Sequence, residues 1–137
     1  MKENVPREVS VPIERELDIV SARQVGRELA AALGFSSTDQ TLLATAISEV
    51  ARNIVNYAGR GTVVVSSVDE AGRRGIVVIA SDHGPGISDI DHAMRDGFST
   101  GNSLGVGLPG ARRLVDDFHL ASAPGQGTTV TLKKWLR

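Results

Sequence analysis

The first apolar positions of the chain alternate with polar ones. Val9, Val11 and Ile13 lie two residues apart, a spacing that is typical of a short β-strand. The spacing then becomes helical, with apolar residues at Val20, Val25, Leu29 and Leu33. Asp18 is the expected N-cap of this helix, and Gly34 is expected to end it.

A second helical pattern begins soon after that glycine. Thr38 or Asp39 is its predicted N-cap, and the helix is expected to reach about Tyr57 before Gly59 closes it. Its apolar residues recur every three or four positions and predict one buried stripe, made of Leu43, Ile47, Val50 and Ile54.

The rest of the chain predicts four strands and one further helix. Two runs rich in β-branched residues are joined by the turn-like segment D-E-A-G-R-R-G. A glycine-rich stretch follows, and then a helix that the Pro109 ring can start. The predicted elements are the strands Thr62–Val68, Gly75–Ser81, His119–Ser122 and Thr128–Trp135 and the helix Leu108–Phe118.

This order of elements, β-α-α-β-β-loop-α-β-β, favours an α+β fold. We expect a two-layer α/β sandwich in which the helices cover one face of a mixed, mainly antiparallel sheet. No linker or repeat interrupts the pattern, so one domain spanning 1–137 is predicted. The irregular stretch from 83 to 110 is too long for a simple connector, and loops of that length are usually functional.

Composition and charge exclude several classes of partner. The chain is 41% hydrophobic and 23% charged, with a net charge of −1 and no cysteine. This near-neutral balance gives no electrostatic footprint for nucleic acid or for a membrane surface. The absence of cysteine excludes disulfides and thiolate metal sites, and the N-terminus lacks the apolar core of a signal peptide. We therefore expect a cytoplasmic protein.

Polar side chains gather along one edge of the second predicted helix. At about 100° per residue, Asn53 and Asn56 lie within about 40° of Glu49 and away from the apolar stripe. A carboxylate there suits a general base, and an Asn oxygen suits a hard cation such as Mg²⁺. Taken alone, E-x-x-x-N is a weak signal, and an ordinary solvated helix face is then the favoured interpretation.

A D-x-G-x-G motif follows the strand predicted over 75–81. Asp82 can accept a hydrogen bond from an exocyclic amine such as that of adenine. Gly84 and Gly86 allow the backbone to turn sharply and to approach a flat ligand. The same residue types are also typical of a plain turn, so the motif alone leaves both interpretations open.

Glycines and hydroxyl residues precede the third predicted helix. They are Ser99, Thr100, Gly101, Ser103, Gly105 and Gly107. Free amide groups, a helix N-terminus and hydroxyl donors together predict an anion cradle, although a loop without ligand is the alternative. The segment is neither a Walker A loop nor a Rossmann fingerprint. A G-x-G-T turn at 125–128 is common in hairpins and carries little alone.

Taken together, the four motifs are much more specific than any one of them. E-x-x-x-N, D-x-G-x-G, the glycine-rich lid and G-x-G-T follow one another on the expected elements. In this order they resemble the N, G1, G2 and G3 boxes of the GHKL superfamily of ATPases and kinases. The resemblance covers residues 18–135 and implies the Bergerat fold with bound ATP.

Five longer stretches resemble the RsbT-type switch kinases of bacterial partner-switching systems. They are D-I-V-S-A-R-Q-V-G-R-E-L-A (18–30), A-I-S-E-V-A-R-N-I (46–54), D-G-F-S-T (96–100), L-G-V-G-L-P-G-A-R-R-L (104–114) and K-K-W-L-R (133–137). The resemblance implies a protein serine/threonine kinase that uses ATP and Mg²⁺ to phosphorylate STAS-domain proteins of a stressosome-like complex. Such kinases are thereby released and activate a downstream regulator, often a phosphatase.

The resemblance also implies roles for individual residues. Glu49 would orient or deprotonate the substrate hydroxyl, Asn53 would hold Mg²⁺, and Asp82 would bind the adenine amine. Gly84 and Gly86 would bring the backbone to the base, and Thr128 would support Asp82. The residues that match the lid over the phosphates are Thr100, Gly101, Gly105, Val106, Gly107 and Leu108.

One departure from the pattern concerns the lid. Anti-sigma relatives carry an arginine just before the lid glycines, where this sequence has Asn102 and Ser103. Arg95 could replace it only if the loop folds back. Two other functions share the fold. One is an anti-sigma factor that mainly binds a sigma subunit. The other is a detached ATPase module of a histidine kinase or gyrase, expected least because 137 residues leave little room for its accessory domains.

Overall fold

The computed structural model describes residues 8–87, 94 and 107–137. Its elements are β1 (Glu8–Ile13), α1 (Glu16–Leu33), α2 (Ser37–Tyr57), β2 (Gly61–Glu70), β3 (Arg73–Asp82), α4 (Gly107–Arg113), β4 (Asp117–Ser122) and β5 (Thr128–Trp135). Their order is the predicted one, and β5 has the predicted bounds. No helix in the described ranges is long and apolar enough to cross a lipid bilayer.

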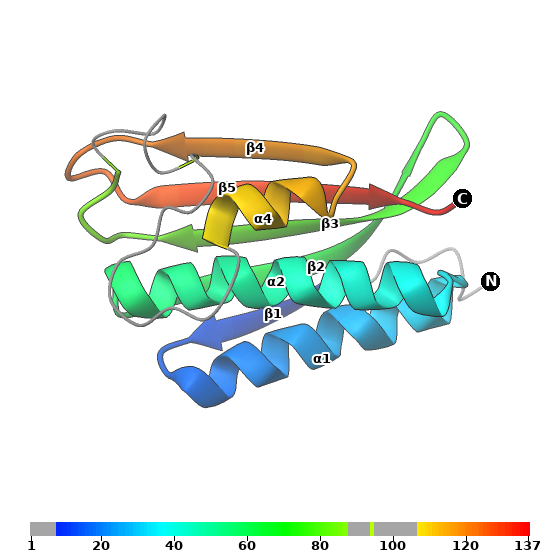
Figure 1. Ribbon diagram of the computed structural model, residues 1–137, viewed down its shortest axis with the longest axis horizontal. Helices are drawn as coiled ribbons and strands as arrows, with labels where there is room; N and C mark the ends of the chain where they lie inside the picture. The colour runs from blue at the N-terminus through cyan, green and yellow to red at the C-terminus, as the bar shows by residue number, and fades with distance from the viewer. Residues whose placement is uncertain (1–7, 88–93, 95–106) are drawn as a thin grey trace.

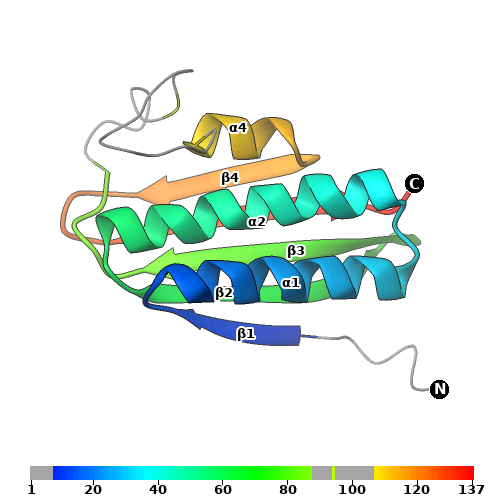
Figure 2. The ribbon, with the colours of Figure 1, turned by 60° about the horizontal axis from the view of Figure 1, so that its bottom comes forward.

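The strands form one sheet in the order β1-β2-β3-β5-β4. Helices α1, α2 and α4 cover one face of this sheet, so the predicted two-layer α+β sandwich is confirmed (Figures 1 and 2). Every neighbouring pair among the described strands is antiparallel, whereas a mixed sheet was predicted. Strands β3 and β4 run in the same direction, but β5 lies between them and is antiparallel to both. The two parallel strands are therefore never neighbours in the sheet.

The core lies between the helices and the sheet. The predicted stripe of α2 is confirmed, because Leu43, Ile47, Val50 and Ile54 are all almost fully buried. In α1, Val20 is one of the four apolar residues at helical spacing but is 47% exposed, and its neighbour Ile19 is buried in the core. Helices α1 and α2 approach closely at Gly26, where a Cβ atom would collide with the end of Ile47.

Both long helices begin earlier than predicted. Asp18 lies inside the first turn of α1, and its Oδ2 accepts hydrogen bonds from the backbone N–H of Glu14 (2.8 Å) and Arg15 (3.1 Å). Ser36 is the cap of α2, because its Oγ accepts from the Asp39 N–H at 3.1 Å. Residues 36–39 are all good capping types, so sequence alone did not select among them.

The third helix is shorter than predicted. It ends at Arg113, residues 114–116 form a turn, and Asp117 and Phe118, which were expected in the helix, begin β4 instead. The Asp116 N–H donates to the Lys133 carbonyl at 2.9 Å, and the Trp135 N–H donates to Asp116 Oδ2 at 2.7 Å. These bonds to β5 fix the end of the helix. The local sequence pattern around residues 108–118 cannot predict them, because β5 is a separate strand later in the chain.

Candidate nucleotide site

Asp82 and Thr128 lie opposite each other on two neighbouring strands. Asp82 is the last residue of β3, Thr128 is the first of β5, and the two are register partners. Their exposed fractions are only 8% and 6%. Asp82 Oδ1 accepts a hydrogen bond from the Gly84 N–H at 2.8 Å, which closes a tight turn. A buried carboxylate and a buried hydroxyl thus lie side by side at this end of the sheet.

The loop after β3 is interlocked with the loop before β5. The Gly125 N–H donates to the Pro85 carbonyl at 2.7 Å. Gly86 has a φ of 78°, and a Cβ atom there would collide with the Ala123 carbonyl oxygen. At Gly84 a Cβ atom would lie 2.6 Å from the Cβ of Ala58, at the end of α2. Both predicted glycines are therefore required by packing within the protein, whatever they also contribute to ligand binding.

Sequence reasoning missed Ser122, the last residue of β4. Its Oγ accepts from the Ile87 N–H at 2.8 Å, donates to the Gly127 carbonyl at 2.9 Å and contacts Thr128 Oγ1 at 2.8 Å. Because the Ser122 proton goes to Gly127, the Thr128 hydroxyl is the donor in the last contact, and its lone pairs remain for an incoming donor. The available signal was the alternation of Phe118, Leu120 and Ser122, which places a polar residue at an inward position.

Glu49 lies on α2 where that helix meets the start of α4. Its side chain is buried, and Oε1 accepts a hydrogen bond from the Gly107 N–H at 3.0 Å. Its Oε2 lies 3.6 Å from Arg52 Nη1, a contact the sequence prediction did not include although Arg52 is one turn away. Asn53 is half-buried, and Asn56 is exposed. The carboxylate is therefore oriented by both a backbone amide and a guanidinium.

The predicted site residues divide into those the structure describes and those it does not. Asp82, Gly84, Gly86 and Thr128 are brought together at one end of the sheet. Glu49, Gly107 and Leu108 meet between α2 and α4, and Leu108 is buried. Thr100, Gly101, Gly105 and Val106 lie outside the described residues.

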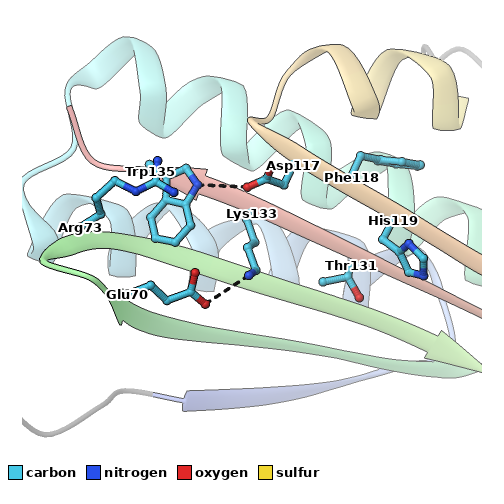
Figure 3. Close-up of a pocket in the computed structure, with 8 residues that line it drawn as sticks. All are labelled: Glu70, Arg73, Asp117, Phe118, His119, Thr131, Lys133 and Trp135. Atoms are coloured by element: carbon cyan, nitrogen blue, oxygen red, sulfur yellow. Dashed lines mark hydrogen bonds and ion pairs between the residues drawn. The ribbon is translucent and has the colours of Figure 1, made fainter.

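The polar groups of this region are compatible with a nucleotide that carries an exocyclic amine. The buried Asp82 carboxylate is an acceptor suited to an exocyclic amine, and the Asn53 carboxamide is an oxygen ligand suited to a hard cation. In the part of the chain that the structure describes, no three acidic or histidine side chains are grouped as a metal site. A hollow of about 340 Å³ on the sheet face opposite the helices, beside Trp135, Lys133 and Glu70, contains none of the predicted site residues (Figure 3).

The matches to known proteins agree with this geometry. The profile of the histidine kinase-, DNA gyrase B- and HSP90-like ATPases matches residues 38–137. The serine/threonine-protein kinase RsbT of Bacillus subtilis is 53% identical over 127 residues, which are 93% of this chain and 96% of that relative. The chain belongs to this ATPase family and, within it, to the RsbT-type serine/threonine kinases.

Other relatives of this kinase are more distant. An anti-sigma F factor of Thermoanaerobacter is 28% identical over 120 residues, covering 84% of this chain and 83% of that relative. The crystal structure of the RsbU and RsbW domains of a Mycobacterium tuberculosis protein superposes with a TM-score of 0.64 at 23% identity. It covers 98% of this chain, which spans only 33% of that larger protein, and the likeness concerns the fold.

Proposed function

We propose that this kinase transfers the γ-phosphoryl group of ATP to a serine or threonine of a STAS-domain protein in a bacterial partner-switching system. The observation that carries the proposal is the buried Glu49 carboxylate, fixed by the Gly107 amide where α4 begins. The 53% identity to the serine/threonine-protein kinase RsbT over most of both chains supports a protein serine or threonine as the phosphoryl acceptor. We further propose that the kinase, once released in the cytoplasm, activates a downstream regulator such as a phosphatase.

The adenine would bind at the end of β3 and β5. Asp82 uses one oxygen for the Gly84 turn, and its second oxygen would accept the exocyclic amine of the base. Thr128 keeps acceptor lone pairs because its proton is directed to Ser122. Since both side chains are buried, this polar contact would form in a dry environment, where it discriminates strongly between bases.

The phosphates would lie between α2 and the start of α4. Asn53 would hold Mg²⁺ through its carboxamide oxygen, and the cation supplies charge compensation to the phosphate oxygens when it is bound. Leu108 and the amide of Gly107 fix the α4 end of this region. The lid residues Thr100, Gly101, Gly105 and Val106 would cover the phosphates.

The chemical step needs a base and an oriented hydroxyl. Glu49 would remove the proton of the substrate hydroxyl while the oxygen of that hydroxyl attacks the γ-phosphorus. The bond from that phosphorus to the β,γ-bridging oxygen breaks, and ADP leaves with the electron pair. The Gly107 amide and Arg52 hold the Glu49 carboxylate in one orientation. The oxygen that accepts the proton therefore does not have to be reoriented during the reaction.

Replacing Glu49 by Gln tests this assignment. Gln can still accept from the Gly107 N–H, but it cannot take up a proton, so transfer to the protein substrate should fall about 10²- to 10⁴-fold. Affinity for ATP should stay within about threefold, because the base contacts the attacking hydroxyl rather than the nucleotide. Both are measured with radiolabelled ATP and by calorimetry.

The matched control is Glu28→Gln, on the exposed side of α1, where the carboxylate contacts only Gln24 among described residues. It should leave both quantities unchanged. A Glu49→Gln protein that binds ATP and phosphorylates its substrate at the wild-type rate would end the general-base assignment.

An anti-sigma factor is the second candidate function. The match to an anti-sigma F factor at 28% identity over 84% of this chain favours it. Such a protein would mainly hold a sigma subunit, and phosphorylation would serve to end that hold. The two functions differ in their partner, which is a STAS-domain protein for the kinase and a sigma subunit for the anti-sigma factor.

A further inference from the structure

Lys134 is a buried lysine that the proposed reaction leaves unexplained. It lies on the helix-covered face of β5 with an exposed fraction of only 4%. Its Nζ donates to the Leu114 carbonyl at 3.1 Å, just after α4 ends, and lies 3.7 Å from Asp39 Oδ1. Asp39 is in the first turn of α2. The ammonium group therefore joins β5, the beginning of α2 and the end of α4.

The two charged contacts bracket α4. Glu49 reaches the helix at Gly107, its first residue, and Lys134 reaches the carbonyl that follows its last turn. A cation near a helix C-terminus also interacts favourably with the helix dipole. With only seven residues, α4 has little stability of its own, so these contacts and its packing against α2 fix its position (Figures 1 and 2).

The neighbours of Lys134 hold the connection after α4 as well. The Lys133 carbonyl accepts from the Asp116 N–H, and the Trp135 N–H donates to the Asp116 carboxylate. Arg137 pairs with the same carboxylate. The K-K-W-L-R segment thus anchors the end of α4 through backbone and side chain together, and Lys134 is the member whose ammonium group contacts α2 and the carbonyl after α4.

We propose that Lys134 is a positioning residue: by holding the end of α4 it sets the place of the Gly107 amide against Glu49. This inference rests on the proposed function for its effect on catalysis, but not for its effect on Gly107. Removal of the ammonium group would let α4 shift along α2, and a displacement of about 1 Å can reduce a rate up to about 10²-fold.

Lys133 provides a matched control. It is the adjacent residue of β5, carries the same charge and pairs with Glu70 at 3.2 Å. Figure 3 shows it on the face of the sheet away from the helices, beside Trp135. Lys133→Met therefore removes the same charge from the same strand without touching α4.

The first experiment follows the Gly107 amide by ¹⁵N–¹H NMR in the whole chain without nucleotide. Glu49→Gln marks the direction in which the Gly107 signal moves when its acceptor becomes neutral. Lys134→Met keeps the aliphatic stem, and it should shift the Gly107 signal while Lys133→Met leaves it in place. If Lys134→Met does not fold, Lys134→Gln replaces it. The Gln side chain is polar and uncharged, and its nitrogen lies one bond short of the Nζ position.

The second experiment measures phosphoryl transfer in the same variants. Lys134→Met should lower kcat by about 10- to 100-fold while the KM for ATP changes less than about threefold, since Asp82 and Thr128 lie at the other end of β5. Lys133→Met should retain both parameters. A general loss of stability would instead lower the active fraction, which thermal unfolding of each variant measures directly.

The outcomes separate the inference from the proposed function. A folded Lys134 variant whose Gly107 signal is unchanged would overturn the positioning role, whether or not the protein is active. An altered Gly107 signal with an unchanged kcat would overturn the link to catalysis. If Lys134→Met shifts the Gly107 signal but the wild-type protein phosphorylates nothing, the positioning role would be supported and the proposed reaction contradicted.

Discussion

At the scale of single residues, Asp82 illustrates how a short motif acquires its chemistry. Its carboxylate is buried at the end of β3, one oxygen is engaged by the Gly84 N–H, and Thr128 lies across from it. A buried charge makes stronger hydrogen bonds than an exposed charge. A buried charge that lacks a partner costs free energy of folding. The surroundings of Asp82 therefore make it the most sensitive point of the predicted base site.

Asp82→Asn should weaken ATP binding about 10- to 100-fold. Asn can still accept from the Gly84 N–H, so the turn is kept, but its NH₂ group then meets the adenine amine. A charge-assisted hydrogen bond contributes about 1.5–3 kcal/mol, which corresponds to that loss of affinity. Calorimetry with ATP measures it, and Asp69→Asn at the exposed end of β2 is the control. Unchanged affinity would mean that the adenine lies elsewhere.

The motif residues were predictable, but several of their partners were not. Glu49, Asp82 and Thr128 follow from the order and spacing of the motifs, and the structure gives each a buried position. Ser122 and Lys134 bond to residues that come close only once β4 and β5 are paired. Contacts of this kind depend on strand register, and no local spacing in the sequence encodes them.

At the scale of elements, the two interlocked loops fix the mouth of the base site. Residues 82–87 and 123–128 pass each other at backbone distance, with glycines at the contacts. A side chain can change its rotamer to make room, but a carbonyl group in such a loop can move only with its backbone. The loops therefore form one rigid unit. A Cβ atom added at one of the contact glycines would force them apart.

Gly86→Ala should destabilise the fold more than Gly125→Ala. Both glycines have positive φ, 78° and 75°, so each alanine suffers a similar left-handed strain of roughly 1–2 kcal/mol. The alanine at 86 also collides with the Ala123 carbonyl, whereas nothing lies within 4 Å of a Cβ at 125. The extra loss should be about 1–3 kcal/mol, the usual range for overpacking.

Chemical denaturation of both variants gives this difference in the free energy of unfolding. Equal losses would show that the loops separate without cost. Such a result would also leave Gly86 free for the role toward the nucleotide base that the motif predicts.

Element types and the α+β class could be predicted because hydrophobic periodicity is local. Gly34 ends α1 and Tyr57 ends α2 as predicted, but the starts of α1 and α2 and the end of α4 differ from the prediction. Several adjacent capping residues compete at the start of α2, and Ser36 is the one that bonds to the Asp39 amide. The end of α4 is decided by β5, whose backbone and side-chain bonds draw Asp116 toward the sheet.

At the scale of the whole molecule, the identity of the partner decides between the two candidate functions. A capture experiment from the source cell, with immobilised kinase and ATP, should enrich a STAS-domain protein. Glu49→Gln should retain more of it than the wild type, because in the proposed reaction the partner is released only after it is phosphorylated. Mass spectrometry of the eluate measures both. A sigma subunit as the main captured protein would instead favour the anti-sigma function.

The position of β5 inside the sheet has a consequence for biosynthesis. Strands β1 to β3 leave the ribosome well before β5, yet β5 is the strand that pairs with β3. Until residues 128–135 emerge, β3 has an open edge, and such edges invite pairing with other chains. The nascent chain therefore carries this open edge until residues 128–135 have emerged, and this is the stage at which a chaperone would benefit it most.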